Sequence, residues 1–248
     1  MRTIYILWLR QVKKYLRSPS RVIGSLGQPI LYLVALGYGL GSIYAKAGGG
    51  NYIQFLTPGV IGMSVLFTSI FSGIEIIWDK QFGFLKETMV APVSRFNIML
   101  GRTLGGATVA SLQGIVVLIL SVVVGFRLTN FSLLIPAFVF MFLTALLFTA
   151  LGTAIAARLN DMQGFQLIMN FLVMPIFFLS GALFPLSGLP KIIEYLTRIN
   201  PLSYGIDGLR GTLIHAATFN LWTDFGILAV LSILFIAVGA YLFSTIEA

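Results

Sequence analysis

Cysteine is absent from this sequence of 248 residues, and His215 is its only histidine. Without cysteine, the chain has no disulfide scaffold, no thiolate metal site and no thiol nucleophile. A lone histidine in a loop is typical of a solvated position. No metal cluster, catalytic triad or pair of carboxylates can be assembled from the remaining residues. The sequence therefore predicts no catalytic residue, no metal site and no cofactor.

The sequence also lacks the G-x-x-x-x-G-K-[ST] loop that cradles phosphates in nucleotide hydrolases. The chain is therefore not expected to hydrolyse ATP by itself, and an ATP-driven activity would need a motor on another polypeptide. Channels and secondary transporters share this absence, so it does not choose between transport mechanisms.

Charge is scarce as well, since charged residues make up only 10% of the chain. A water-soluble domain has about a quarter of its residues charged, whereas this chain is 58% apolar, with a mean hydropathy of +0.96. These values predict an integral membrane protein. The net charge of +8 is also typical of nucleic-acid binding, but the positions of the Lys and Arg residues favour a membrane surface, and we expect no nucleic-acid partner.

Six stretches are apolar enough to cross a bilayer as helices, which takes about 20 residues at ~1.5 Å each. They are Val22–Tyr44, Pro58–Ile77, Phe96–Phe126, Leu133–Ala157, Gly164–Phe184 and Leu221–Ile246. The third is too long for one span, so we expect its first part to approach the membrane from the cytoplasm and to enter it near Leu104. The sequence thus predicts an all-α polytopic membrane protein, with six transmembrane helices in a single domain over residues 1–248.

Most of the basic residues lie on one side of these spans. With the N-terminus inside, 11 of the 16 are cytoplasmic: Arg2, Arg10, Lys13, Lys14, Arg17, Arg21, Lys80, Lys86, Arg95, Arg102 and Arg158. The outside would hold Lys46, Arg127, Lys191, Arg198 and Arg210. Because short cytoplasmic loops are enriched in Lys and Arg, we expect a multi-pass protein of the inner (cytoplasmic) membrane with both termini in the cytoplasm.

Residues 1–20 form a distinct element before the first span. One face of a helical wheel is apolar, with Ile4, Tyr5, Trp8, Leu9, Val12, Tyr15 and Leu16, and the opposite face carries Arg10, Lys13, Lys14 and Arg17. This segregation predicts an amphipathic interfacial helix, with its apolar face in the headgroups and its basic face toward anionic lipid or an acidic partner. The alternative is that the charges only set the topology.

The segment 78–95, WDKQFGFLKETMVAPVSR, joins the second and third spans and mixes charges with exposed aromatic residues. A short helix from Asp79 to Val90 would place Phe82, Leu85 and Met89 on one side. Such an apolar ridge fits a groove on a partner protein. It equally suits a helix that lies flat on the membrane or packs beneath the chain's own bundle.

The segment 186–220 precedes the last span and is too patterned for a simple loop. Lys191–Ile199 and Ser203–Leu213 have the character of two short helices, separated by Asn200-Pro201. We expect a helical hairpin that dips into the outer leaflet and caps the exit of the pore. A plain outer loop packed on the bundle is the alternative.

Glu75 is the ionisable residue that we single out within the predicted spans, because a charge at mid-bilayer costs at least ~2.5–3.5 kcal/mol. It lies close to Asp79 and Lys80, so it either pairs at the inner interface or serves as a gate or pathway residue. We interpret the other spans as carrying only neutral polar groups, such as Gln113. This scarcity disfavours proton- or sodium-coupled transport and favours an amphipathic or lipid-like substrate.

The run WDKQFGFLKETMVAPVSR resembles the first cytoplasmic loop of the ABC-2 family of ATP-binding-cassette exporter permeases. The run NPLSYGIDGLRG, Asn200–Gly211, resembles the segment before that family's last span. The likeness extends over essentially the whole chain. It implies that two permease copies form the path and that a separate ATPase subunit docks beneath each one. It also implies that the coupling contact includes Phe82, Gly83, Phe84, Leu85, Lys86 and Glu87.

Together, the residues and the resemblance predict the membrane subunit of an ATP-driven exporter, a homodimer or a dimer with a similar partner. Its substrate would be an amphipathic drug-like molecule, a lipid or a lipid-linked saccharide. One alternative is an ATP-independent secondary transporter or channel. Another is an intramembrane enzyme, which would need a Ser–His pair or a metal site at depth.

Overall fold

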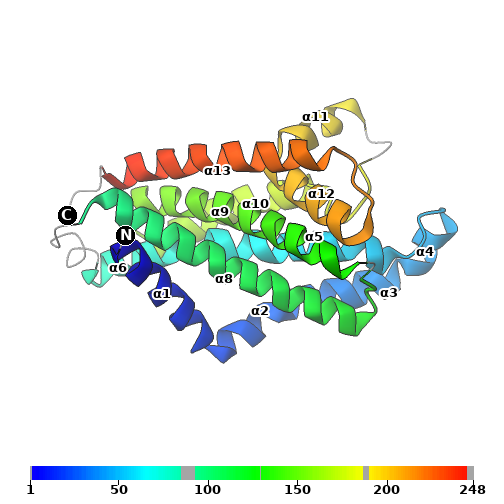
Figure 1. Ribbon diagram of the computed structural model, residues 1–248, viewed down its shortest axis with the longest axis horizontal. Helices are drawn as coiled ribbons and strands as arrows, with labels where there is room; N and C mark the ends of the chain where they lie inside the picture. The colour runs from blue at the N-terminus through cyan, green and yellow to red at the C-terminus, as the bar shows by residue number, and fades with distance from the viewer. Residues whose placement is uncertain (1, 85–92, 129, 187–189, 245–248) are drawn as a thin grey trace.

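The computed structural model describes residues 2–84, 93–128, 130–186 and 190–244, and within these ranges all regular secondary structure is helical. In chain order the elements are α1 (Arg2–Leu16), α2 (Pro19–Leu31), a π-helical stretch (Tyr32–Leu36), α3 (Gly37–Gly39), α4 (Gly41–Lys46), α5 (Tyr52–Phe71), α6 (Ile74–Gln81), α8 (Arg95–Val124), a 3-10 turn (Phe131–Leu133), α9 (Leu134–Arg158), α10 (Met162–Phe178), α11 (Lys191–Ile199), α12 (Pro201–Ile214) and α13 (Leu221–Ser244). Figure 1 shows the long helices running side by side along the longest axis of the molecule.

Within the described ranges, five helical stretches are long and apolar enough to cross a membrane. They are Val22–Gly39, Tyr52–Gln81, Arg95–Val124, Phe131–Arg158 and Leu221–Phe243. The helix α10 is apolar too, but it has only 17 residues. Even the 18-residue stretch rises ~27 Å, close to the thickness of a bilayer core. The prediction of an all-α polytopic membrane protein is confirmed.

Several of the predicted spans have different bounds in the structure, and the second, third and fifth are examples. The second begins at Tyr52 rather than Pro58, because the Asn51 side chain accepts a hydrogen bond from the Ile53 N–H and starts the helix there. The third is one uninterrupted helix from Arg95 to Val124. The fifth ends at Phe178 rather than Phe184, since the chain turns at Gly181 with a φ of 73°.

The helix α5 lies at the centre of the bundle, against α8, α9 and α12. It approaches α9 so closely that a Cβ atom on Gly152 would lie 2.5 Å from the Ile70 carbonyl oxygen. In contrast, α2 and α10 present large apolar side chains outward; Ile23 is 69% exposed and Phe171 is 83% exposed. The core is therefore built around α5, and its last turn, just before α6, is held tightly against α9.

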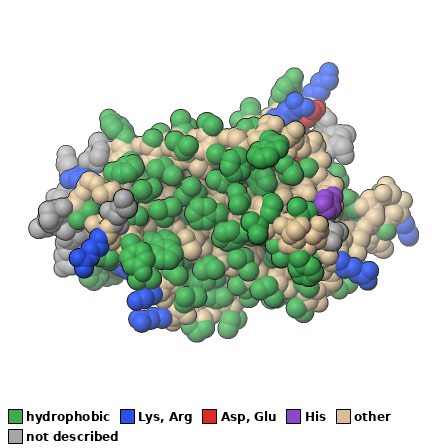
Figure 2. All heavy atoms as spheres, viewed as in Figure 1, with side chains coloured by type: hydrophobic (Ala, Val, Ile, Leu, Met, Phe, Trp, Pro, Cys, Tyr) green, Lys and Arg blue, Asp and Glu red, His purple; other side chains and the backbone are tan. Residues whose placement is uncertain are grey.

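The bundle has two ends with different contents. The helices α1 and α6 and the C-terminal end of α13 lie together at one end, here called the α6 end (Figure 1). At the opposite, α12 end lie α4, α11 and α12. Figure 2 shows apolar side chains over the middle of the visible face, with Lys and Arg toward the two ends. This distribution is typical of a protein whose middle faces lipid.

The segment before the last span contains the two predicted short helices. The first, α11, matches the predicted Lys191–Ile199, and α12 spans Pro201–Ile214 around the predicted Ser203–Leu213. Asn200 separates them, because its side-chain oxygen caps α12 by accepting from the Leu202 N–H, and Pro201 occupies the first helical position, where its missing N–H costs nothing. The depth of this hairpin in a membrane stays a prediction.

Candidate functional site

Exposed aromatic side chains gather where α6 ends. Trp78 is 48% exposed, Phe82 63% and Phe84 50%. The Trp78 and Phe82 rings lie 5.6 Å apart between centroids. Large aromatic side chains presented at a helix end, beyond the buried core of α5, form the kind of surface that partner proteins cover.

The predicted helix from Asp79 to Val90 is wrong in its first part. The helix α6 begins at Ile74 and ends at Gln81, and Gly83 has a φ of 79°, which a helix cannot continue through. Phe82, Gly83 and Phe84 are described, whereas Leu85, Lys86 and Glu87 lie outside the described residues, together with the remainder of that predicted helix. A Cβ atom on Gly83 would meet nothing within 4 Å, so this position needs glycine for its backbone conformation.

A buried ion pair joins α6 to α8. Asp79 and Arg102 are 7% and 4% exposed, and the Arg102 guanidinium donates to the Asp79 carboxylate. Arg10 of α1 reaches the other oxygen of Asp79 at 3.5 Å. A buried charge is tolerated only when it is paired, so this carboxylate fixes three helices relative to one another.

Two further side chains of α6 bind neighbouring helices. The Glu75 carboxylate lies 2.9 Å from the Lys14 ammonium of α1. The Lys80 ammonium donates to the carbonyl oxygens of Ala156, Ala157 and Leu159, at 3.2, 2.7 and 3.0 Å. These carbonyls end α9, where a helix leaves acceptors unsatisfied and its dipole favours a cation. Glu75 thus pairs with a basic neighbour, one of the two roles expected for it.

The N-terminal helix packs on α8 instead of resting on lipid alone. A Cβ atom on Gly101 would lie 3.0 Å from the Ile4 carbonyl oxygen, and one on Gly105 would lie 2.7 Å from Gln11. The Trp8 indole N–H donates to the Thr108 hydroxyl at 2.9 Å. The small residues of α8 therefore let α1 cross it closely. Ile4 and Trp8, on the apolar face of α1, thus contact α8.

The four basic residues predicted for α1 divide into two pairs. Arg10 and Lys14 bind the acidic residues of α6 while their side chains stay about half exposed, and Lys13 and Arg17 are exposed as well. All four thus have the solvated position expected of a basic face. Contact of α1 with a membrane surface stays a prediction.

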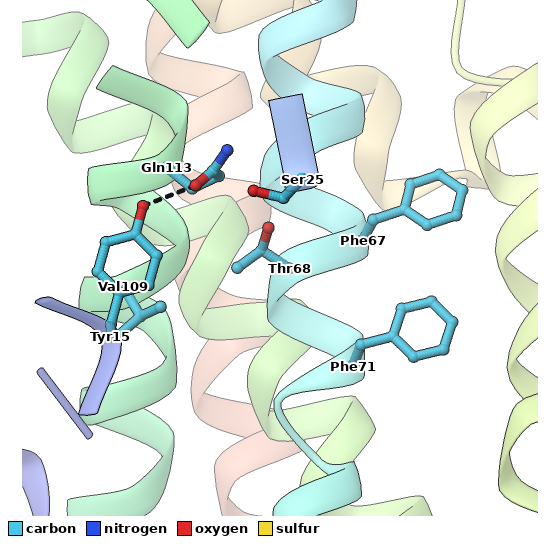
Figure 3. Close-up of a pocket in the computed structure, with 7 residues that line it drawn as sticks. All are labelled: Tyr15, Ser25, Phe67, Thr68, Phe71, Val109 and Gln113. Carbon is cyan, nitrogen blue, oxygen red and sulfur yellow. Dashed lines mark hydrogen bonds between the residues drawn. The ribbon is translucent and has the colours of Figure 1, made fainter. Parts of the chain in front are cut away.

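A cavity of about 200 Å³ lies where α1, α2, α5 and α8 meet (Figure 3). Its lining consists of Tyr15, Ser25, Phe67, Thr68, Phe71, Val109 and Gln113, none of them charged. The Tyr15 hydroxyl donates to the Gln113 side-chain oxygen at 2.6 Å. The cavity is thus formed in part by α1, the same helix that carries the pairs with α6.

At the α12 end, the side chains of Asp207 and Asn200 bind main-chain groups. The Asp207 carboxylate accepts from the N–H groups of Thr218 and Phe219 at 2.8–3.0 Å. The Asn200 amide donates to the Ile176 carbonyl at 2.6 Å. Each contact joins a side chain to main chain, so these residues stabilise one arrangement of the hairpin on the bundle.

Arg210 is buried at the same end, with 4% exposure. It donates to the Gly181 carbonyl at 3.0 Å, and its guanidinium carbon lies 4.1 Å from the centre of the Phe55 ring. Burial lowers the pKa of Arg210 to about 10, and the Asp207 charge opposes that shift. The side chain is therefore still a cation at neutral pH, stabilised by a carbonyl and a ring face.

The interpretation that the spans other than the second carry only neutral polar groups is wrong. Asp224, in the first turn of α13, is fully buried, and Arg102 is buried within α8. Asp224 was detectable as an acidic residue inside the last predicted span. The pairing of Arg102 with Asp79 had no sequence signal, because the two residues lie on different helices.

The chain matches the family model described as "ABC-2 type transporter" over residues 2–214. It belongs to the ABC-2 type transporter family. This ABC-2 permease is therefore a membrane transport protein, as the resemblance of its segments 78–95 and Asn200–Gly211 implied.

Among curated proteins, the permease is 27% identical to Nodulation protein J of Rhizobium leguminosarum bv. viciae, over 90% of this chain and 87% of the relative. It is 29% identical to Nodulation protein J of Rhizobium meliloti (strain 1021), over 84% and 80%. The inner membrane transport permease YadH of Escherichia coli (strain K12) is 27% identical, over 92% and 90%. The similarity thus extends over most of this chain and most of each relative.

Proposed function

We propose that this permease is the membrane subunit of an ATP-driven exporter in the inner (cytoplasmic) membrane, with both termini in the cytoplasm. Permeases of its family work with an ATP-binding subunit. In this proposal the ATPase is a separate polypeptide that docks at the α6 end, on the residues Phe82, Gly83, Phe84, Leu85, Lys86 and Glu87. Two permease copies, a homodimer, enclose the path between them.

The observation that carries the proposal is the set of bonds made by α6. Directly before the docking segment, Asp79 binds Arg102 of α8 and Arg10 of α1, and Lys80 binds the end of α9. A push on the exposed aromatic residues after α6 therefore acts on α1, α8 and α9 together. Charged pairs between rigid helices are the kind of contiguous contact through which such movement spreads.

Glu75 has a place in this mechanism. Its pair with Lys14 links α6 to α1 one helical turn away from the Asp79 pair. The Lys14 side chain is about half exposed whereas Glu75 is mostly covered. We assign Glu75 the role of a gate residue, because its pair with Lys14 makes α1 move with α6.

The substrate in this proposal is an amphipathic molecule: drug-like, a lipid or a lipid-linked saccharide. Support comes from the uncharged lining of the cavity between α1, α2, α5 and α8, which pairs apolar rings with hydroxyl and amide groups. A lining of this kind suits a ligand with an apolar body and a neutral polar group.

Co-purification with an ABC-type ATPase subunit from the same organism tests the docking surface. We expect the double variant Phe82→Asp, Phe84→Asp to lose most of the bound ATPase, because two buried carboxylates oppose an apolar contact. Tyr195→Asp is the matched control, since Tyr195 is 67% exposed at the α12 end. Full retention of the ATPase by the double variant would sink the proposed docking site. Transport that persists with a hydrolysis-deficient ATPase would instead support the ATP-independent alternative.

A further inference from the structure

The cavity in Figure 3 contains a buried hydrogen-bond donor that the protein leaves unused. Gln113 is 1% exposed, and its side-chain oxygen is taken by the Tyr15 hydroxyl. Among the described residues, its amide nitrogen has no hydrogen-bond partner. Buried donors are almost always satisfied in folded proteins, so this nitrogen marks a position for an acceptor that arrives from outside the chain.

The groups around Gln113 restrict what that acceptor can be. In Figure 3 the Gln113 amide nitrogen points away from Tyr15, and the Ser25 and Thr68 hydroxyls lie on the side of Gln113 opposite Tyr15. None of the seven lining residues is charged. A charged ligand group would lose its hydration without gaining a counter-ion, so the cavity selects an uncharged oxygen.

The size and the walls define the rest of the ligand. The volume of about 200 Å³ is below the ~300–1,000 Å³ of sites that enclose a whole drug-sized molecule. Phe67 and Phe71 stand one helical turn apart on α5, with their rings 6.2 Å apart between centroids, and both line the cavity. The cavity therefore suits one polar group of a larger molecule, with an apolar chain along the rings.

We propose that this cavity is a subsite for an uncharged hydroxyl, ether or carbonyl group carried on an apolar chain, with the Gln113 amide nitrogen as its hydrogen-bond donor. Only the role of this subsite in export rests on the proposed transport function. Binding of a ligand to the subsite needs neither ATP nor an ATPase. Tyr15 is a positioning residue, because its bond to the Gln113 oxygen turns the amide nitrogen toward the cavity.

Tyr15 also connects the subsite to the α6 end. It follows Lys14, whose ammonium pairs with Glu75, and lies five residues after Arg10, which pairs with Asp79. When α1 shifts with α6, the Tyr15 hydroxyl leaves Gln113 and the amide is free to turn. The subsite is thus coupled to the docking segment through a single helix.

Photolabelling of the permease in lipid nanodiscs tests this subsite. The probe is a dodecyl glucoside with a diazirine on the alkyl chain, and the comparison probe carries a carboxylate in place of the sugar. We expect the neutral probe to label the peptide that contains Phe67 and Phe71, and Gln113→Leu to reduce this labelling at least about fivefold, the effect of one lost hydrogen bond. Gln166→Leu, on the exposed side of α10, is the matched control and should label normally.

Two comparisons keep the result unambiguous. Thr68→Val is nearly isosteric and should reduce labelling by about twofold or more even if Gln113→Leu folds poorly.

Nanodiscs of ether lipids and of ester lipids separate the two sources of the ligand oxygen. Weaker labelling in ester lipids identifies the lipid carbonyl as the occupant, and equal labelling identifies a free amphiphile. If neither Gln113→Leu nor Thr68→Val reduces the labelling, or if the carboxylate probe labels more strongly than the neutral one, the proposed subsite is wrong. The proposed exporter function would still stand.

Discussion

The two ends of the bundle use charge in different ways. At the α6 end, ion pairs and a charged hydrogen-bond donor join segments far apart in the chain, such as Asp79 with Arg102 and Lys80 with Ala157. At the α12 end, the ion pair between Arg198 and Glu194 lies within one helix, and the buried side chains of Arg210 and Asp207 bind main-chain groups, the Gly181 carbonyl and the Thr218 N–H. The first end joins separate helices through charged side chains, whereas the second fixes the hairpin through bonds to main chain. Movement imposed on the first therefore spreads through the bundle.

The largest loss of unfolding free energy should come from breaking the ion pair between Asp79 and Arg102 at the α6 end. Asp79→Asn leaves the Arg102 charge buried without its carboxylate, which costs about 3–5 kcal/mol of unfolding free energy. Glu194→Gln breaks an exposed pair within one helix, Arg198 to Glu194, and should cost no more than about 0.5 kcal/mol. Chemical unfolding in detergent measures both. Equal losses would contradict the contrast between the ends, as would a stable Asp79→Asn.

A smaller loss is expected where α1 crosses α8. In Gly105→Ala the new methyl group would lie 2.7–2.8 Å from Gln11 side-chain carbons, and such overpacking costs about 1–3 kcal/mol. Gly226→Ala is the control, because its Cβ would meet nothing within 4 Å and alanine favours a helix by ~1 kcal/mol. The same unfolding assay separates them. A Gly105→Ala variant as stable as the control would show that α1 is not tightly docked.

The smallest effect concerns pH at the α12 end. Burial raises the pKa of Tyr204, the Asp224 charge raises it further, and Arg198 opposes both. A raised pKa means that the folded state holds this proton more tightly, so the contribution to stability is complete below the ordinary pKa of 10.0 and is lost as the pH rises above it. Tyr204→Phe should therefore flatten the alkaline part of the stability profile. An unchanged profile would show that the Tyr204 hydroxyl contributes nothing there.

The sequence anticipated the helices better than the contacts between them. The predicted Lys191–Ile199 helix has those bounds in the structure, because Pro190 and Asn200-Pro201 are local signals. The helix predicted from Asp79 failed because Gly83 ends it, and glycine adopts either helical or positive φ equally well. The Gly101-x-x-x-Gly105 spacing was visible, but one sequence cannot tell which helix fills it.

Composition and local pattern by themselves determined that this permease is a helical membrane protein, and they predicted that its segments 1–20, 78–95 and 186–220 stand apart from the spans. Hydrophobic runs, prolines and basic loops influence only the residues near them in the sequence, so they can be interpreted without knowing the fold. Only the tertiary structure decided that Asp79 binds Arg102, that α1 packs on α8 and that Gln113 faces a cavity with a spare donor. Those features depend on how helices pack, and packing brings together residues whose separation in sequence carries no information about their contact.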